Sequence, residues 1–345
     1  MVNLAAAVAP VGEMPVGSMV ELPGRGSTYV IDTGTTERDA DSPTLVLLHA
    51  LACTGTLTWY PAIAKLAEKA RVVVLDQRWH GRGIRSERFT LEDCADDVAA
   101  LADVLALDRV VPVGYSMGSL VSQLMWKRHR DRVAGLVLCA GAAHFKRNSR
   151  ERVALESLSY GLGALKPRPG PVPVGGPRFG GDRVWAYSQF RETSYGAIGR
   201  ATAEIGKFDS TAWVGDIDVP TAVVVPTKDL IIPPRRQRWL ARQIAGAATY
   251  EVDCGHSSCV MNAGPFTEGL LAASFFGACA RAALTSSAKA SGKASARSHS
   301  RGASSWHETR PTSSRPSSDI TVTFRPAPWN TGPSGYICLM RAPRK

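Results

Sequence analysis

Hydrophobic and polar residues follow one another along this chain in patterns that predict a series of strands and helices. Continuous apolar runs over residues 44–49 (TLVLLH) and 71–76 (RVVVLD) are typical of strands covered on both faces. Apolar residues at helical spacing over 91–107 predict an amphipathic helix. Two short stretches, 18–22 and 28–32, are separated by Pro-Gly-Arg-Gly and predict a hairpin.

From residue 44 onward, predicted strands alternate with predicted helices. This alternation indicates a parallel sheet with helices on both faces. The remaining strands are expected at 109–113, 133–139, 221–226 and 249–253, and the other helices at 61–69, 120–129, 235–245 and 262–281. We therefore predict an α/β fold with a mostly parallel, eight-stranded sheet.

The alternation stops between residues 143 and 218, where charged helical stretches, a Pro/Gly-rich segment and aromatic-bearing helices predict an inserted cap. Beyond residue 281 the chain is rich in Ser, Ala, Arg and Pro, a composition that favours disorder. The expected organisation is a flexible N-terminus (1–14), a core domain in two parts (15–142 and 219–281), the cap (143–218) and a disordered basic tail (282–345).

The net charge of +11 is concentrated in the tail, so it does not indicate that the globular part binds an anionic partner. Residues 281–345 hold 11 Lys and Arg against 2 Asp and Glu, whereas the preceding 280 residues hold 30 against 28. A nearly neutral globular part has no basic groove, so we expect no specific nucleic-acid partner. The tail is either a basic arm for acidic surfaces or an extension without a role.

The 7 cysteines are scattered, odd in number and lack metal-ligand spacing. They favour a reduced, cytoplasmic protein without a metal site. The N-terminus has no convincing signal peptide, and no segment reaches the roughly 20 apolar residues of a membrane-spanning helix.

The most informative stretch is Gly114-Tyr115-Ser116-Met117-Gly118, which lies between a predicted strand and a predicted helix. A serine on such a tight turn has a strained backbone, and the flanking glycines let strand and helix pass close together. The turn also places Ser116 at a helix N-terminus, where backbone N–H groups can face a developing oxyanion. We interpret this stretch as a nucleophile elbow.

An activated serine needs a base and an acid that orients the base. Asp229 follows the predicted strand TAVVVP, and His256 follows the last predicted strand in a Cys-Gly-His loop. The order Ser, Asp, His is that of α/β-hydrolase triads. Asp253 is a rival acid, but it lies only three residues from His256 on the strand itself.

With these residues in place, the chain resembles the α/β-hydrolase superfamily over about residues 15–280, and in particular its bacterial esterase, lactonase and C–C hydrolase branch. The family's His-Gly signature is matched by His49-Ala50-Leu51, with alanine for glycine, and Trp59 follows as expected. The family's Asp-x-Arg-Gly-His-Gly stretch is matched by residues 76–83 (DQRWHGRG), where Trp79 replaces a glycine.

The resemblance implies an oxyanion hole formed by the backbone N–H groups of Leu51 and Met117. His49 and His80 are expected to hydrogen bond loop backbone rather than to react. For the substrate pocket we predict Trp59, Trp79, Trp185 and Tyr187, although the cap aromatics could equally fill the cap's own core.

The function predicted from the sequence is hydrolysis of carboxylic esters with apolar acyl groups, through Ser116, His256 and Asp229. The substrate would be a small-molecule ester, with no cofactor. The oligomeric state is left open. Alternatives on the same fold are lactone, thioester or C–C bond hydrolysis and cofactor-free perhydrolysis. An alternative of another class is a non-catalytic binding protein on a hydrolase scaffold.

Overall fold

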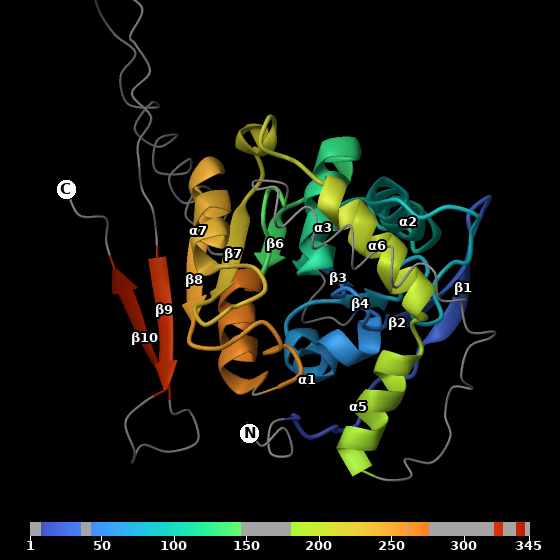
Figure 1. The fold of residues 1–345 in the computed structure, drawn as a ribbon, viewed down its shortest axis with the longest axis horizontal. Coiled ribbons are helices and arrows are strands. Elements are labelled where there is room, and N and C mark those ends of the chain that lie inside the picture. Colours follow the sequence, from blue (N-terminus) through green and yellow to red (C-terminus); the bar gives the residue numbers. More distant parts are fainter. Residues whose placement is uncertain are drawn as a thin grey trace, which may run out of the picture.

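A single twisted sheet runs through the computed structural model, which describes residues 8–35, 43–145, 181–261, 263–275, 321–326 and 336–341. The eight predicted strands are present and follow the order β1-β2-β4-β3-β5-β6-β7-β8 (Figure 1). Neighbours from β4 to β8 pair in parallel, while β1 and β2 are antiparallel. The bounds are β1 Ser18–Leu22, β2 Gly26–Asp32, β3 Thr44–Leu48, β4 Val72–Leu75, β5 Val110–Tyr115, β6 Leu136–Cys139, β7 Thr221–Pro226 and β8 Ala248–Val252.

Two further strands come from the predicted disordered tail. Strand β9 (Thr321–Pro326) pairs in parallel with β8, and β10 (Tyr336–Arg341) pairs antiparallel with β9. The expectation of disorder is therefore wrong for these two segments. The edge of β8 offers backbone N–H and C=O groups, and short β-branched and apolar runs can satisfy them by pairing. The rest of 282–345 lies outside the described residues.

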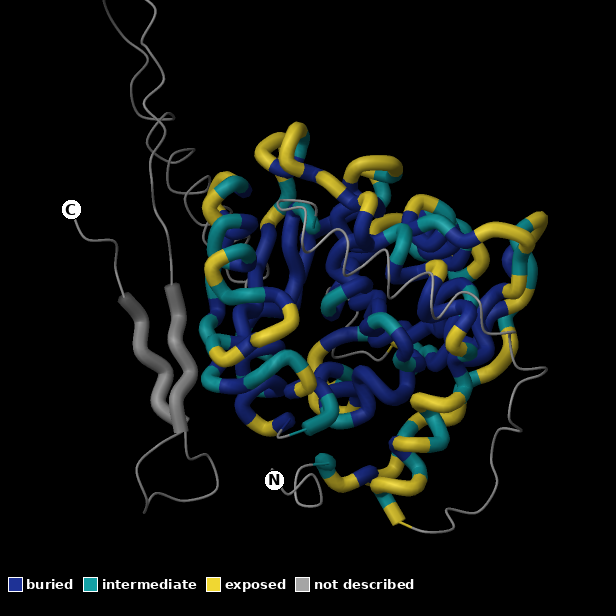
Figure 2. The backbone as a smooth tube through the Cα atoms, in the orientation of Figure 1, coloured by how far each residue is buried: buried dark blue, intermediate teal, exposed yellow. Residues whose placement is uncertain are grey.

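Alternate residues of the strands point to opposite faces, and each face has its own hydrophobic core. On one face Val46 and Leu48 pack with α2 (Leu91–Val104), α3 (Met117–Arg128) and α7 (Pro234–Gln243). On the other, Leu45 and Leu47 pack with α1 (Gly55–Ala67) and a helix over 263–275. Burial of each such side chain contributes roughly 1.5 to 3 kcal/mol. Figure 2 shows the buried residues concentrated on the strands between these layers.

Helix α1 begins earlier than predicted, at Gly55 rather than at Pro61. The side chain of Thr54 caps the helix by accepting the N–H of Leu57 at 3.0 Å. Pro61 therefore lies inside the helix. The sequence pattern favoured a start at the proline, but the threonine cap and the buried first turn outweigh the one backbone hydrogen bond that proline cannot make.

Residues 8–14, expected to be flexible, include contacts with the core. Val8 forms a β-bridge with Met261, and the hydroxyl of Tyr60 donates to the carbonyl of Ala9 at 2.7 Å. Residues 1–7 lie outside the described part of the chain.

The cap is described from residue 181 onward, as α5 (Gly181–Arg191) and α6 (Tyr195–Lys207). Both helices lie within the predicted aromatic-bearing stretch, whereas residues 146–180 are outside the described residues. Helix α5 lies near α1 and α6 near α2 (Figure 1). Only Ala186 of α5 is buried, so this helix contacts the core through few residues (Figure 2).

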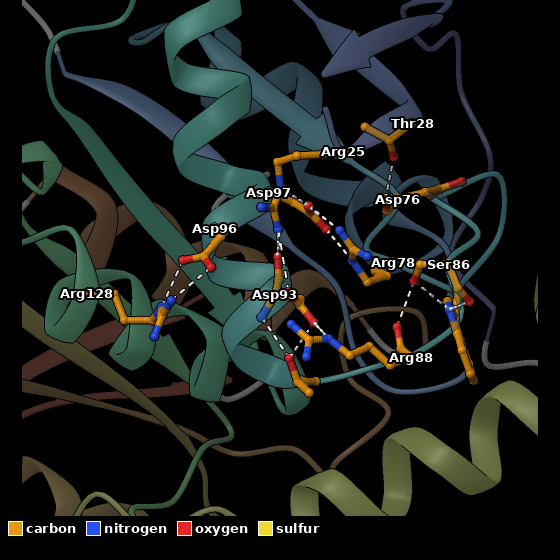
Figure 3. Close-up of polar contacts among 12 residues, drawn as sticks. Arg25, Thr28, Asp76, Arg78, Ser86, Arg88, Asp93, Asp96, Asp97 and Arg128 are labelled. Carbon is orange, nitrogen blue, oxygen red and sulfur yellow. Dashed lines mark hydrogen bonds and ion pairs between the residues drawn. The ribbon is translucent and has the colours of Figure 1, made fainter. Parts of the chain in front are cut away.

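One carboxylate joins three segments that are distant in sequence. Asp97 of α2 accepts two hydrogen bonds from Arg78, at 2.7 and 2.9 Å, and a third from Arg25 of the β1–β2 turn at 2.6 Å (Figure 3). Arg78 and Asp97 are both nearly inaccessible to solvent. Because a buried carboxylate is costly unless it is paired, this arrangement fixes the loop after β4 against α2.

Candidate active site

Ser116 lies at the turn between β5, which ends at Tyr115, and α3, which begins at Met117. Its backbone has φ 52° and ψ −111°, a conformation that residues other than glycine rarely adopt. The turn is held by hydrogen bonds from the Ser116 N–H to the carbonyl of Cys139 at 2.9 Å and from Ser119 N–H to the Ser116 carbonyl at 3.0 Å. The predicted strand, sharp turn and helix are thus observed.

The two glycines of this stretch are required by close backbone packing. A Cβ on Gly114 would collide with the backbone of Gly118, and a Cβ on Gly118 would collide with the carbonyl of Leu48 on β3. Helix α3 can therefore begin directly against the sheet, which positions the Ser116 side chain at the ends of the parallel strands.

The structure brings the three predicted triad residues together. His256 Nε2 lies 3.1 Å from Ser116 Oγ, and His256 Nδ1 lies 2.7 Å from Asp229 Oδ2. Both distances are within hydrogen-bonding range. The imidazole therefore joins the hydroxyl to the carboxylate in one continuous chain of hydrogen bonds.

Asp229 is held by three further donors among the described residues, besides the histidine. Its Oδ1 accepts the backbone N–H groups of Ile231 and Ile232, each at 2.8 Å, and its Oδ2 accepts the side-chain amide of Gln237 at 3.0 Å. The rival acid has other partners, because Asp253 bonds with Lys228 at 3.0 Å and with Thr227 at 3.2 Å. Only Asp229 of these two carboxylates contacts the imidazole.

The loop that carries His256 is anchored to the residue before Ser116. The phenol of Tyr115, which is fully buried, donates to the backbone carbonyl of His256 at 2.6 Å and lies 3.3 Å from Ser258 Oγ. Burial raises the pKa of Tyr115 well above its ordinary value, so the phenol remains a donor. This contact was not predicted, since nothing local in the sequence pairs a strand-end tyrosine with a loop 141 residues away.

The loop before α1 carries the predicted oxyanion-hole residue Leu51. Among the described residues, no acceptor receives the backbone N–H of Leu51 or that of Met117. The loop is fixed through His49, whose Nδ1–H donates to the Ala50 carbonyl at 2.8 Å while Nε2 accepts the Gln77 N–H at 2.8 Å. Burial lowers the pKa of His49 to about 4, so the ring stays neutral, as this pair of bonds requires.

His80 also contacts loop backbone, as expected, with Nδ1 3.0 Å from the Arg78 carbonyl. Burial lowers its pKa to about 3, and the nearby His49 adds to the effect. Trp79, the residue before His80, has φ 67°, a backbone conformation that favours glycine. Its indole N–H donates to Ser86 at 3.1 Å, and Arg200 of α6 lies over the ring, 5.1 Å from its centroid.

The four predicted pocket residues are not gathered in one place. Trp59 is fully buried in the core, 6.1 Å from the ring of Tyr115, so its side chain serves packing rather than an accessible pocket. Trp185 packs edge-on against Tyr60 at 5.1 Å, and Tyr187 is 62% exposed on the outer side of α5. Trp79 of the core contacts the cap at another place, through Arg200 of α6. The sequence gives aromatic positions on a helix but not the direction in which each faces.

The cysteines near the site fit a packing role. Cys254 and Cys259 are buried, and burial raises the pKa of Cys53 and of Cys254 to about 11, which keeps these thiols protonated. Within the described ranges, no group of three or more His, Cys, Asp or Glu side chains is arranged to hold a metal. In the same ranges, no helix is both long and apolar enough to cross a membrane.

Comparison with known proteins gives a consistent picture. Residues 45–268 match the model of a family described as the alpha/beta hydrolase family. The pimeloyl-[acyl-carrier protein] methyl ester esterase of Chromobacterium violaceum is 28% identical over 61% of this chain and 85% of that protein. The putative carbamate hydrolase RutD of Pseudomonas syringae is 25% identical over 68% of this chain and 94% of its own length. The enol-lactonase structure from Burkholderia xenovorans LB400 covers 74% of this chain and 98% of its own, with 26% identity and a TM-score of 0.58.

Proposed function

Since this chain belongs to the α/β hydrolase family, we propose that it is a serine hydrolase that cleaves carboxylic esters through Ser116, His256 and Asp229. The observation that carries the proposal is the imidazole of His256, which lies within hydrogen-bonding distance of both Ser116 Oγ and Asp229 Oδ2. A strained serine backbone at φ 52°, with a base within hydrogen-bonding distance of the hydroxyl, is useful for catalysis and has no evident use in a binding protein.

In the proposed mechanism, Ser116 Oγ attacks the ester carbonyl while His256 Nε2 takes its proton. Asp229 holds the ring so that Nδ1 carries the other proton, and its negative charge stabilises the imidazolium that forms. The N–H groups of Leu51 and Met117 donate hydrogen bonds to the oxyanion that forms. Each such donor contributes roughly a hundredfold or more in rate. His256 then protonates the leaving alcohol and activates the water that releases the acid.

The choice of an ester is supported by two findings. A relative that aligns over 85% of its length is named as a methyl ester esterase. Leu51, which carries one of the two proposed oxyanion N–H groups, is apolar and only partly buried, which suits an apolar acyl group beside it. Lactone hydrolysis is the second candidate, because the enol-lactonase is 26% identical and a lactone is a cyclic ester open to the same attack.

The proposal is tested with a fluorophosphonate label and a panel of acyl esters, thioesters and lactones. We expect covalent labelling at Ser116 and no labelling or ester hydrolysis by Ser116→Ala. Ser119→Ala is the matched control, because its buried hydroxyl, on the same helix, has no hydrogen-bond partner among the described residues. Labelling that persists in Ser116→Ala, or a purified protein that turns over no member of the panel, would refute the proposal.

A further inference from the structure

We propose that Gln237 is a positioning residue for Asp229 and thereby sets the lower pH limit of the reaction. This inference rests on the proposed function, because it concerns the acid of the proposed triad. Gln237 lies on α7 and donates to Asp229 without contacting the reacting atoms.

The contact is direct and buried. Gln237 is completely inaccessible to solvent, and its Nε2 lies 3.0 Å from Asp229 Oδ2 and 2.7 Å from the carbonyl of Ile232. The oxygen of Asp229 that accepts the amide is the same oxygen that lies 2.7 Å from His256 Nδ1. The amide and the imidazole therefore share one acceptor atom.

The orientation of the amide is determined by its partners. Both groups near Nε2, the Asp229 carboxylate and the Ile232 carbonyl, are acceptors, so a reversed amide would place its oxygen against two other oxygens. In the observed orientation each amide hydrogen has one acceptor, while Gln237 Oε1 has no hydrogen-bond partner among the described residues. The amide therefore makes two donor contacts while leaving one buried acceptor unsatisfied, which carries a cost in polarity.

The consequence for His256 follows from the charge on Asp229. Within the described residues, four donors meet the carboxylate, namely the N–H groups of Ile231 and Ile232 on Oδ1, and Gln237 and His256 on Oδ2. The three donors other than His256 stabilise the negative charge of the carboxylate and so make Oδ2 a weaker acceptor for the imidazole. Without the amide, Oδ2 becomes a stronger acceptor and favours the protonated imidazole, which cannot act as the base.

Four charged or titratable neighbours of the triad in the described part of the chain have partners of their own or remain neutral. Lys228 pairs with Asp253 at 3.0 Å, beside the loop that carries Asp229. On α7, Arg238 pairs with Glu251 of β8 at 2.6 Å. The thiol of Cys254 and the phenol of Tyr115 stay protonated, because burial raises the pKa of both. A change at Gln237 therefore acts on His256 mainly through Asp229.

The first test replaces the amide with an apolar group of similar length, in Gln237→Met. We expect the acid limb of kcat/KM for a p-nitrophenyl ester to move to higher pH by about 0.5 to 1 unit, the effect of one hydrogen bond on a neighbouring ionisation. The pH dependence of fluorophosphonate labelling should move by the same amount. Gln243→Met is the matched control, because Gln243 lies on the same helix and its amide lies 3.5 Å from the carbonyl of Trp239.

The second test, Gln237→Glu, has the opposite pH signature. A protonated glutamic acid can donate to Asp229, whereas an ionised one places a like charge beside it. We expect activity that falls with rising pH where the wild type shows a plateau. The proposal is overturned if both variants keep the wild-type pH profile and lose only melting temperature, as a merely structural residue would. A wild type that neither labels nor hydrolyses esters would instead refute the proposed function.

Discussion

The contact between Glu192 and Arg82 gives a prediction about stability that does not depend on catalysis. Glu192 follows α5 of the cap, and its Oε2 lies 3.8 Å from Arg82 Nε in the core, too far for a hydrogen bond. The Glu192 side chain is only 6% exposed. Burial raises the pKa of Glu192 from its ordinary value of 4.5 to about 7, although Arg82 opposes the shift.

The sign of the effect follows from proton linkage. Between pH 4.5 and about 7 the folded chain holds the Glu192 proton while the unfolded chain has released it. The free energy of unfolding therefore falls as the pH rises through this window. A shift from 4.5 to about 7 corresponds to about 3 kcal/mol at 1.36 kcal/mol per pH unit. This contribution is fully present below pH 4.5 and is lost above about pH 7.

Glu192→Gln removes the titrating group and keeps the shape of the side chain. We expect the difference in unfolding free energy between variant and wild type to move by up to about 3 kcal/mol in favour of the variant from pH 5 to pH 8. Urea denaturation at a series of pH values measures this difference. Any constant offset, such as the loss of the Arg82 partner, cancels in the comparison. Parallel stability curves for the two proteins would refute the argument.

Three further predictions concern the site and its surroundings. Asp229→Asn should lower turnover about 10,000-fold, because an amide cannot hold the imidazole in the required tautomer, whereas Asp253→Asn should stay near wild type. If steady-state kinetics show the reverse pattern, Asp253 and not Asp229 is the acid of the triad. Trp79→Gly should be about 1 kcal/mol more stable than Trp79→Ala in thermal unfolding, since φ 67° favours glycine, and a more stable alanine variant would contradict the strain. Ester hydrolysis should rise up to about fourfold for each added acyl methylene from acetyl to medium chains and then fall, and a flat series would argue against an apolar acyl pocket.

The positions of the eight strands and the mostly parallel sheet could be predicted, because each strand is marked by a local pattern. Apolar runs mark the strands, and the proposed triad residues Ser116, Asp229 and His256 each lie at or shortly after the end of one of them. The start of α1 was placed too late, because Thr54 caps the helix and the pattern gave more weight to Pro61. The pairing of β9 with β8 could not be foreseen, because it joins segments that are far apart in the sequence.

Residues that act from a distance were missed for a related reason. Gln237 and Tyr115 contact the triad only because α7 packs on β7 and because the loop after β8 returns to the end of β5. Trp59 was placed in the pocket because an aromatic residue in α1 can face either the core or the substrate, and one sequence does not show which. The sequence pattern predicts whether a segment is a helix or a strand, but it does not predict the direction in which a given side chain faces.

The carboxylate of Asp97 also bears on the order in which the chain acquires its native contacts. Its bonds with Arg78 span 19 residues, whereas its bond with Arg25 spans 72. Closing the longer loop costs more chain entropy, so the short-range pair can form while the β1–β2 hairpin is still detached. Docking of the hairpin then completes the cluster and fixes the loop after β4, whose Gln77 holds His49 and with it the segment that carries Leu51. In this order of events, the parallel strands assemble first, and the backbone N–H of Leu51 is fixed only when the hairpin docks.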